Sequence, residues 1–166
     1  MAKDLSNKYT PGGYVKMMSI LHIGILATPI ILGILFYVEA KKTELSFSVS
    51  DDMFLAIVPI MSICCILLGD FLFKKITGSL PREMELLTKL TRFQTASIVK
   101  YALIEGAAIF CMVIFTNTQN LTYLLIGALI VLYLLFQRPT KQKIEDVLDL
   151  RGEEKARFDR VNKVLE

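Results

Sequence analysis

The sequence predicts an all-α membrane protein with four transmembrane helices and both termini in the cytoplasm. Three observations predict this class. Of the 166 residues, 54% are hydrophobic, and they are concentrated in long blocks instead of recurring with a short period. The blocks are solidly apolar, whereas a transmembrane β-barrel would show alternation. Lysine and arginine are distributed unevenly among the segments that separate the blocks.

Four blocks are long enough to cross a bilayer, because a span needs about 20 mostly apolar residues for about 30 Å of hydrocarbon. In lipid, a single open segment satisfies its own backbone groups only as a helix. The first block follows a basic stretch, but its apolar run is too long for a signal peptide, so we interpret it as a retained anchor. The predicted spans cover about 17–38, 53–73, 96–116 and 121–137.

The orientation follows from the basic residues. Three precede the first span, two follow it, five lie between the second and third spans, none lies between the third and fourth, and eight lie in the C-terminal segment. The positive-inside rule therefore places both termini and the middle loop in the cytoplasm. The net charge of +3 is too small to indicate nucleic-acid binding. Orientation and contact with anionic lipid explain the basic residues better.

The middle loop carries an amphipathic segment. A helix start at Ser79-Leu80-Pro81 is followed by apolar residues at helical spacing, which predicts an interfacial helix on the cytoplasmic surface between spans two and three. A solvated linker helix that packs on its own bundle is an equally good interpretation. The apolar residues are Met84, Leu87, Leu90 and Phe93.

The chain divides into a transmembrane domain, 1–138, and an amphipathic helical tail, 139–166. Thr140 can cap a first short helix, Gly152 is a candidate break, and Phe158 lies on the apolar face of a second helix. The tail has seven basic and seven acidic residues. This balance favours a helix that faces protein, including its own bundle, over one that binds lipid. A solvated tail without a partner is the alternative.

Four ionisable residues fall inside the predicted spans, where insertion costs at least about 2.5–3.5 kcal/mol each. At about 1.5 Å per residue, His22, Asp70 and Lys100 lie about 8, 5 and 6 Å from the cytoplasmic end of their spans, and Glu105 lies about 14 Å deep. All four are candidates for binding an ion or a proton. For His22, Asp70 and Lys100, a local hydrogen bond or snorkelling is the simpler interpretation.

Glu105 is too deep to snorkel easily. Small neighbours, among them Ala102, Gly106 and Ala107, allow helices to approach closely, which indicates that this face points into a bundle. His22 on a neighbouring helix is a possible partner. Glu105 is then either a proton- or cation-exchanging carboxyl or a buried polar clamp. The residues expected at helix-packing contacts are Gly24, Ala102, Gly106, Ala107 and Gly127.

Signatures of catalysis and of cofactor or metal binding are missing from the sequence. The cysteines lie within spans without metal-ligand spacing, and one histidine cannot build a zinc site. Phosphate-binding loops, nucleophile elbows and HExxH motifs do not occur. We therefore expect no enzyme activity, no cofactor and no metal. The cysteines, Cys64, Cys65 and Cys111, are expected to serve packing.

Two resemblances are carried by short stretches in the second half of the chain. The run from Phe93 to Phe110, with Arg138-Pro139-Thr140-Lys141 and the stretch 146–150, resembles uncharacterised four-span inner-membrane proteins of Bacteroidota. This resemblance implies a bacterial inner-membrane location and no known activity. The string Ala102-Leu-Ile-Glu-Gly-Ala-Ala-Ile109 is locally similar to the carboxyl-bearing helix of rotary ATPase proteolipids. The position of Glu105 corresponds there to the ion-binding carboxyl.

Two functions follow as hypotheses. The first is a non-enzymatic membrane component that associates with itself or with another membrane protein, through its spans or through the 139–166 tail. The alternative is a proton- or cation-coupled conductor or small transporter that uses Glu105. In both cases the lipid bilayer is the surrounding partner and no nucleic acid is involved.

Overall fold

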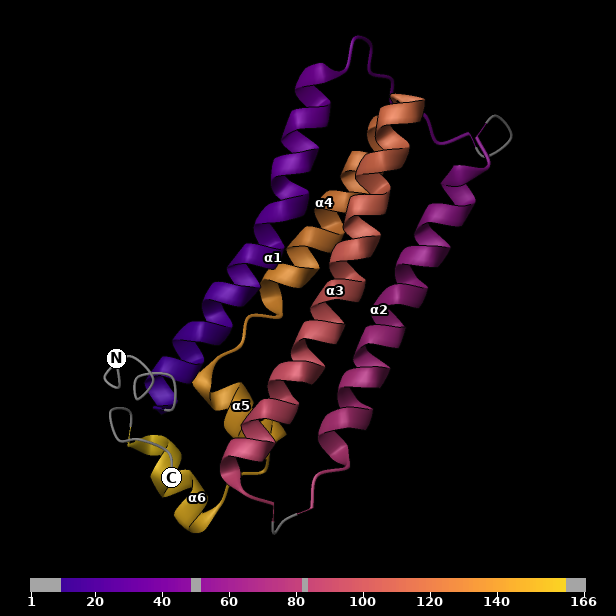
Figure 1. The fold of residues 1–166 in the computed structure, drawn as a ribbon. Helices are drawn as coiled ribbons and strands as arrows, with labels where there is room; N and C mark the ends of the chain where they lie inside the picture. The colour runs from indigo at the N-terminus through magenta and orange to yellow at the C-terminus, as the bar shows by residue number, and fades with distance from the viewer. Residues whose placement is uncertain (1–9, 49–51, 82–83, 161–166) are drawn as a thin grey trace.

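The computed structural model describes residues 10–48, 52–81 and 84–160, and within these ranges the chain is helical without a β-strand. The elements are α1 (Pro11–Glu39), α2 (Phe54–Gly78), α3 (Leu86–Thr118), α4 (Leu121–Phe136), α5 (Lys141–Val147) and α6 (Gly152–Asp159). The four longer helices form a bundle, with α5 and α6 at one end (Figure 1). We call this end the tail end, and the end with the α1–α2 and α3–α4 connections the loop end.

The third helix is the centre of the bundle because it packs against α1, α2 and α4. Figure 1 shows α3 in front of α4, with α1 and α2 on either side. It contains no proline, and Ile104, Ala108, Cys111 and Phe115 are among its fully buried side chains. Its 33 residues span about 50 Å, well beyond the thickness of the hydrocarbon layer. Part of α3 must therefore project out of a bilayer.

Three helices, α1, α2 and α3, are long and apolar enough to cross a membrane. The fourth, α4, has only 16 residues and counts as a span only together with α5, to which it is bent by 79°. The described chain thus has three to four candidate spans, which confirms an all-α membrane protein. The shortness of α4 follows from Pro139, which ends the helix soon after Phe136.

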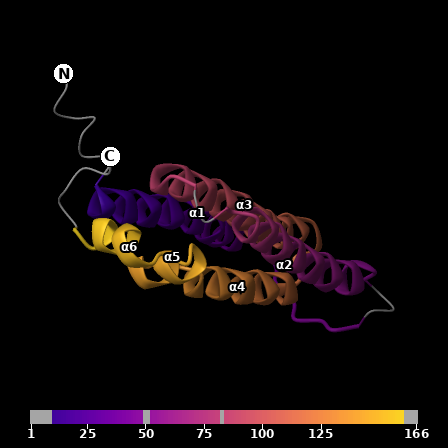
Figure 2. The same cartoon turned by 90° about the horizontal axis from the view of Figure 1, so that it is seen from below.

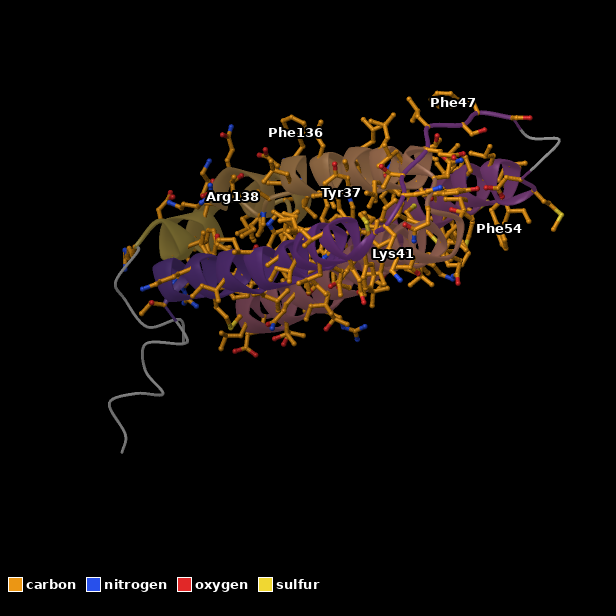
Figure 3. All side chains as sticks on the ribbon, turned by 90° about the horizontal axis from the view of Figure 1, so that it is seen from above. Tyr37, Lys41, Phe47, Phe54, Phe136 and Arg138 are labelled. Atoms are coloured by element: carbon orange, nitrogen blue, oxygen red, sulfur yellow. The ribbon has the colours of Figure 1, made fainter. Side chains whose placement is uncertain are left out.

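Exposed large apolar side chains form a belt around the bundle. They lie at positions 20–38 on α1, 53–71 at the start and along α2, 98–113 on α3 and 125–136 on α4. Charged residues begin directly beyond the belt. Phe136, at its edge, is 75% exposed, and Arg138 follows two residues later (Figure 3). A continuous apolar surface of this extent is typical of contact with lipid. The belt includes α4.

The interfacial helix expected between spans two and three is not a separate element. The segment belongs to α3, which runs from Leu86 into the membrane-length part without a break. Its apolar side chains Leu86, Leu90 and Phe93 are buried against the tail and the start of α1. The apolar face that the spacing predicts is present, but the tail covers it in place of the membrane surface.

The described part of the tail packs on its own bundle (Figure 2). Thr140 caps α5 by accepting a hydrogen bond from the Lys143 backbone N–H at 3.3 Å, as the sequence predicts. Gly152 begins α6, with φ +55°. The Lys89 ammonium donates to both Glu154 carboxylate oxygens, at 2.7 and 2.9 Å, which joins α3 to α6. The apolar contacts involve Tyr14, Met18, Ile144, Leu148, Leu150 and Phe158.

At the loop end, Asn120 joins the two connections. Its side chain caps α4 by accepting from the Thr122 backbone N–H at 3.1 Å, and its amide donates to the Ser46 carbonyl at 3.0 Å. Glu44 and Asn120 form an isolated β-bridge. Tyr123 donates to Asp52 at 2.6 Å. The α1–α2 connection is thereby held against the start of α4.

Replacing Phe158 by alanine should detach the tail from the bundle. The ring is fully buried, and its loss should cost about 3 kcal/mol of docking free energy. Trypsin should then cut at Arg151 and Lys155 faster in detergent-solubilised protein than in the wild type. Phe158→Leu keeps most of the apolar volume and serves as the control. Equal cleavage rates for wild type and Phe158→Ala would show that the tail is not held there.

The pH dependence of tail docking should follow Asp159 and Lys141, whose side chains lie 2.6 Å apart. The hydrogen bond from Lys141 lowers the pKa of Asp159, and the same bond raises the pKa of Lys141. The stability from Asp159 is thus present above its ordinary pKa and lost as the pH falls through its lower folded value. That from Lys141 is lost as the pH rises through its raised value. Carboxyl NMR titration should show the Asp159 midpoint rising in Lys141→Gln, and an unchanged midpoint would disprove the pairing.

Candidate functional site

A layer of polar side chains crosses the bundle at the tail-end edge of the apolar belt. It draws residues from α1, α2, α3, α4 with its C-cap, and α5. Three of the four ionisable residues that the sequence singles out belong to it. We call this the polar layer, and its members are His22, Asp70, Lys100, Tyr101, Tyr133, Gln137 and Lys143.

The ion pair between Asp70 and Lys100 is its centre. The Lys100 ammonium lies 2.6 Å from Asp70 Oδ1, and its side chain is only 9% exposed. It also donates to Gln137 Oε1 at 2.9 Å and lies 5.3 Å from the centre of the Phe73 ring. The Tyr133 hydroxyl donates to the other Asp70 oxygen at 3.1 Å. Each charge therefore has an opposite charge and a further polar partner, which is what burial of an ion pair requires.

Close helix approach positions this pair. Gly69, next to Asp70, is buried, and a side-chain carbon at that position would lie 3.4 Å from the Lys100 carbonyl oxygen. The absence of a side chain lets α2 lie near α3 at this level. The sequence also offers Lys74, four residues after Asp70, as a partner. The structure pairs Asp70 with Lys100 on the neighbouring helix instead.

His22 ties α1 to the end of α4. Its Nε2 lies 2.9 Å from the Leu134 carbonyl oxygen, and because a carbonyl only accepts, Nε2 carries the hydrogen. Its ring meets Tyr101 edge-on at 5.0 Å, and the Tyr101 hydroxyl donates to the Gln137 carbonyl at 2.9 Å. Two side chains thus bind carbonyls at the C-terminal end of α4, where the regular helical bonding pattern ends. The Leu134 carbonyl also accepts from the Gln137 backbone N–H at 2.9 Å.

Lys143 brings a second ammonium group to the layer. It donates to the same Gln137 Oε1 atom that Lys100 uses, at 3.2 Å. Burial lowers the pKa of Lys143, and the like charge of Lys100 lowers it further. Asp70 is the one carboxylate in the layer, so its direct members carry an excess of positive charge. This chemistry suits a helix clamp or an anion more than a cation.

The layer lies at one edge of a bilayer-thick slab. From His22, Asp70, Lys100 and Gln137 to the loop-end terminus of each helix, a rise of about 1.5 Å per residue gives about 24–27 Å. This is close to the hydrocarbon thickness of about 30 Å. The lengths of four helices therefore agree, including the short α4.

Glu105 lies outside the polar layer, further along α3 toward the loop end. Its side chain is partly exposed and makes no hydrogen bond or ion pair with any described residue. The expected pairing with His22 is not present, because His22 binds Leu134 and Tyr101. Glu105 follows Ile104, which is fully buried, and precedes Gly106, which is exposed. It thus lies at the border between the packed face and the open face of α3.

The predicted packing residues divide into two groups. Ala107 is buried, and a side-chain carbon at Gly127 would lie 2.5 Å from Met112 Cε, so both positions allow α3 to pack within the chain. The prediction is wrong for Gly24, Ala102 and Gly106 as contacts inside the bundle, because all three are exposed. Nothing lies within 4 Å of a side-chain carbon placed at Gly24 or Gly106. Within the described residues, these positions pack against no other helix.

Sequence reasoning missed the partners that complete the layer, namely Tyr101, Tyr133, Gln137 and Lys143. A tyrosine in an apolar block signals a hydroxyl that needs an acceptor, and a glutamine at the end of a block signals the border. Which acceptor each group finds depends on the helix arrangement. Comparison of the chain with protein-family models, with curated proteins and with solved structures gave no match.

Breaking the ion pair from one side should cost more than removing it from both sides. Lys100→Met leaves the Asp70 carboxylate without its cation and should lower the free energy of unfolding by about 1–3 kcal/mol. Asp70→Asn combined with Lys100→Met should restore part of this loss. Thermal unfolding in detergent, followed by circular dichroism, measures each variant. Lys75→Met, an exposed lysine at the same end, is the control. Strictly additive effects would contradict a coupled pair.

Proposed function

We propose that this protein is a non-enzymatic component of a bacterial inner membrane that crosses it four times and associates with a second copy of itself. Both termini lie in the cytoplasm. The observation that carries the proposal is the Glu105 carboxyl, which has no partner among the described residues. It lies beside two small exposed residues, Ala102 and Gly106, on a membrane-length helix. The interface is formed by the open face of α3.

The four-span placement is supported by the belt and by charge. All four long helices carry exposed apolar residues over nearly the same height. Basic residues are frequent at the tail end, whereas the short α3–α4 connection has none, and the positive-inside rule assigns the tail end to the cytoplasm. The resemblance of the second half to four-span proteins of Bacteroidota supports the bacterial inner membrane.

The open face of α3 has the features of a helix–helix interface in lipid. Exposed residues recur along it at helical spacing, and they include Ile98, Ala102, Gly106 and Val113. Small residues four apart let two helix backbones approach closely, and this contact drives association in lipid, where the hydrophobic effect does not. The face lies between α1 and α2 (Figure 1).

Glu105 explains why the proposed interface contains a polar contact. A carboxyl in hydrocarbon costs at least about 2.5–3.5 kcal/mol and is retained where it pairs with another group. Two copies related by a two-fold axis bring the same surface, and thus both Glu105 side chains, to one interface. Each carboxyl then meets a polar group of the other copy. Self-association therefore satisfies a group that one copy leaves without a bond.

The alternative is a proton- or cation-coupled conductor that uses Glu105. The same partly exposed carboxyl favours it. His22, the expected partner of Glu105, instead contacts Leu134 and Tyr101, so the contacts support a structural function for this histidine. Flux through protein-containing liposomes that Glu105→Gln abolishes would replace the self-association proposal by this one.

Gly106→Leu should convert dimers to monomers, because the leucine fills the face on which the second helix packs. We expect at least tenfold weaker association, equivalent to about 1.4 kcal/mol. Counting photobleaching steps of fluorescently tagged protein in vesicles at fixed protein-to-lipid ratio measures the change. Glu105→Gln should preserve dimers, since the amide still forms hydrogen bonds, whereas Glu105→Leu should weaken them.

Gly24→Leu is the matched control, because it introduces the same side chain at an equally open position on α1. It should leave the dimer fraction unchanged. A wild type that is strictly monomeric at all densities would overturn the proposal. Loss of dimers in Gly24→Leu with retention in Gly106→Leu would move the interface to α1 and overturn the assignment to α3.

A further inference from the structure

Positive charge is concentrated where α4 ends and α5 begins. Lys143 and Lys100 share Gln137, Arg138 follows that glutamine directly, and Lys74 lies one turn beyond Asp70 on α2. Asp70 is the carboxylate that pairs with this group, and it is paired with Lys100. On α5, Glu145 lies 3.7 Å from both Lys141 and Lys155, and Asp146 is exposed. A positive excess remains even when Asp146 is counted.

The ammonium groups of Lys100 and Lys143 differ in how many of their N–H donors the described residues engage. Lys100 is directed to Asp70, Gln137 and the Phe73 ring, which uses its bonding capacity. The Lys143 ammonium has three N–H donors. Among the described residues, the one acceptor that it contacts is the Gln137 oxygen, at the longer distance of 3.2 Å. Lys143 is half-buried beside a like charge. A negatively charged oxygen placed there would gain donors and relieve the repulsion.

The position of this corner at the edge of the apolar belt indicates where such an anion comes from. Phe136, at the edge of the apolar belt, is followed within two residues by Arg138 (Figure 3). Lipid phosphates lie at that border of a bilayer, next to the last exposed apolar side chains. Basic sites between helices on the cytoplasmic side are suited to anionic headgroups.

We infer that Lys143, with Arg138, binds the phosphate of an anionic phospholipid of the cytoplasmic leaflet at the α4–α5 corner. The acyl chains then lie along the belt beside Phe136. This inference rests on the proposed four-span placement but not on self-association. The inferred lipid site also assigns a function to the bend between α4 and α5, because the bend turns Lys143 back toward Lys100 and Gln137.

The test is lipid titration of the full-length protein in neutral detergent at about 0.15 M salt, which is close to physiological ionic strength. Phosphatidylglycerol, phosphatidylcholine and inorganic phosphate are added in separate series, and circular dichroism records the unfolding midpoint. A ligand that binds the folded state alone raises this midpoint with concentration. We expect phosphatidylglycerol to raise it by several degrees and the other two to leave it nearly unchanged.

Lys143→Gln should weaken the response to phosphatidylglycerol at least tenfold in concentration, and Lys143→Arg should retain it. Lys16→Gln removes one exposed charge from the same side of the membrane and should behave as wild type. If Lys143→Gln is unfolded without lipid, Arg138→Gln takes its place and should weaken the response in the same way. Equal protection by phosphatidylcholine, equal protection by inorganic phosphate, or an equal loss in Lys16→Gln would overturn the inference.

Discussion

The Lys100–Asp70 ion pair is the constraint on which the arrangement of the bundle depends. A charge on the central helix cannot be left in hydrocarbon, so α2 must present Asp70 at the same height, and α4 must end there to present Gln137. Pro139 ends the fourth helix at the height of the polar layer, so its C-cap, Gln137, belongs to that layer. The bend into α5 and the contact of Lys143 with Gln137 follow from that ending.

The fold class could be predicted from the sequence because the long apolar blocks directly indicate membrane-spanning helices. The block from 121 to 137 ends at the residue that caps α4, and Thr140 caps α5 as expected. The amphipathic spacing of Leu90 and Phe93 was also visible, but not what covers it. Lipid, water and another helix all accept the same apolar face. Only the arrangement of the chain shows that the tail buries this one.

The sequence could predict three of the ionisable residues of the candidate site, but not the partners that complete it or how the residues pair. Depth along each helix brought His22, Asp70 and Lys100 to one height, because rise per residue is the same in every helix. Rotation about the helix axis and the choice of neighbours depend on packing. The small residues show the limit most clearly: Ala107 faces the bundle, whereas Gly106, one residue earlier, faces outward. A local sequence pattern cannot distinguish an internal contact from an external one.

The polar layer and Glu105 represent two different solutions for charge in a membrane protein. The layer is closed within one chain, since Asp70, Lys100, Tyr133 and Gln137 satisfy one another at the border of the apolar belt. Glu105 lies within the belt, where a single copy offers it no bond. A group that is costly in lipid and unsatisfied in the monomer can contribute to specificity, because the contact that satisfies it must present a polar partner at one height on one face. The internal network therefore fixes the bundle, and in the proposed dimer the Glu105 carboxyl selects the contact between copies.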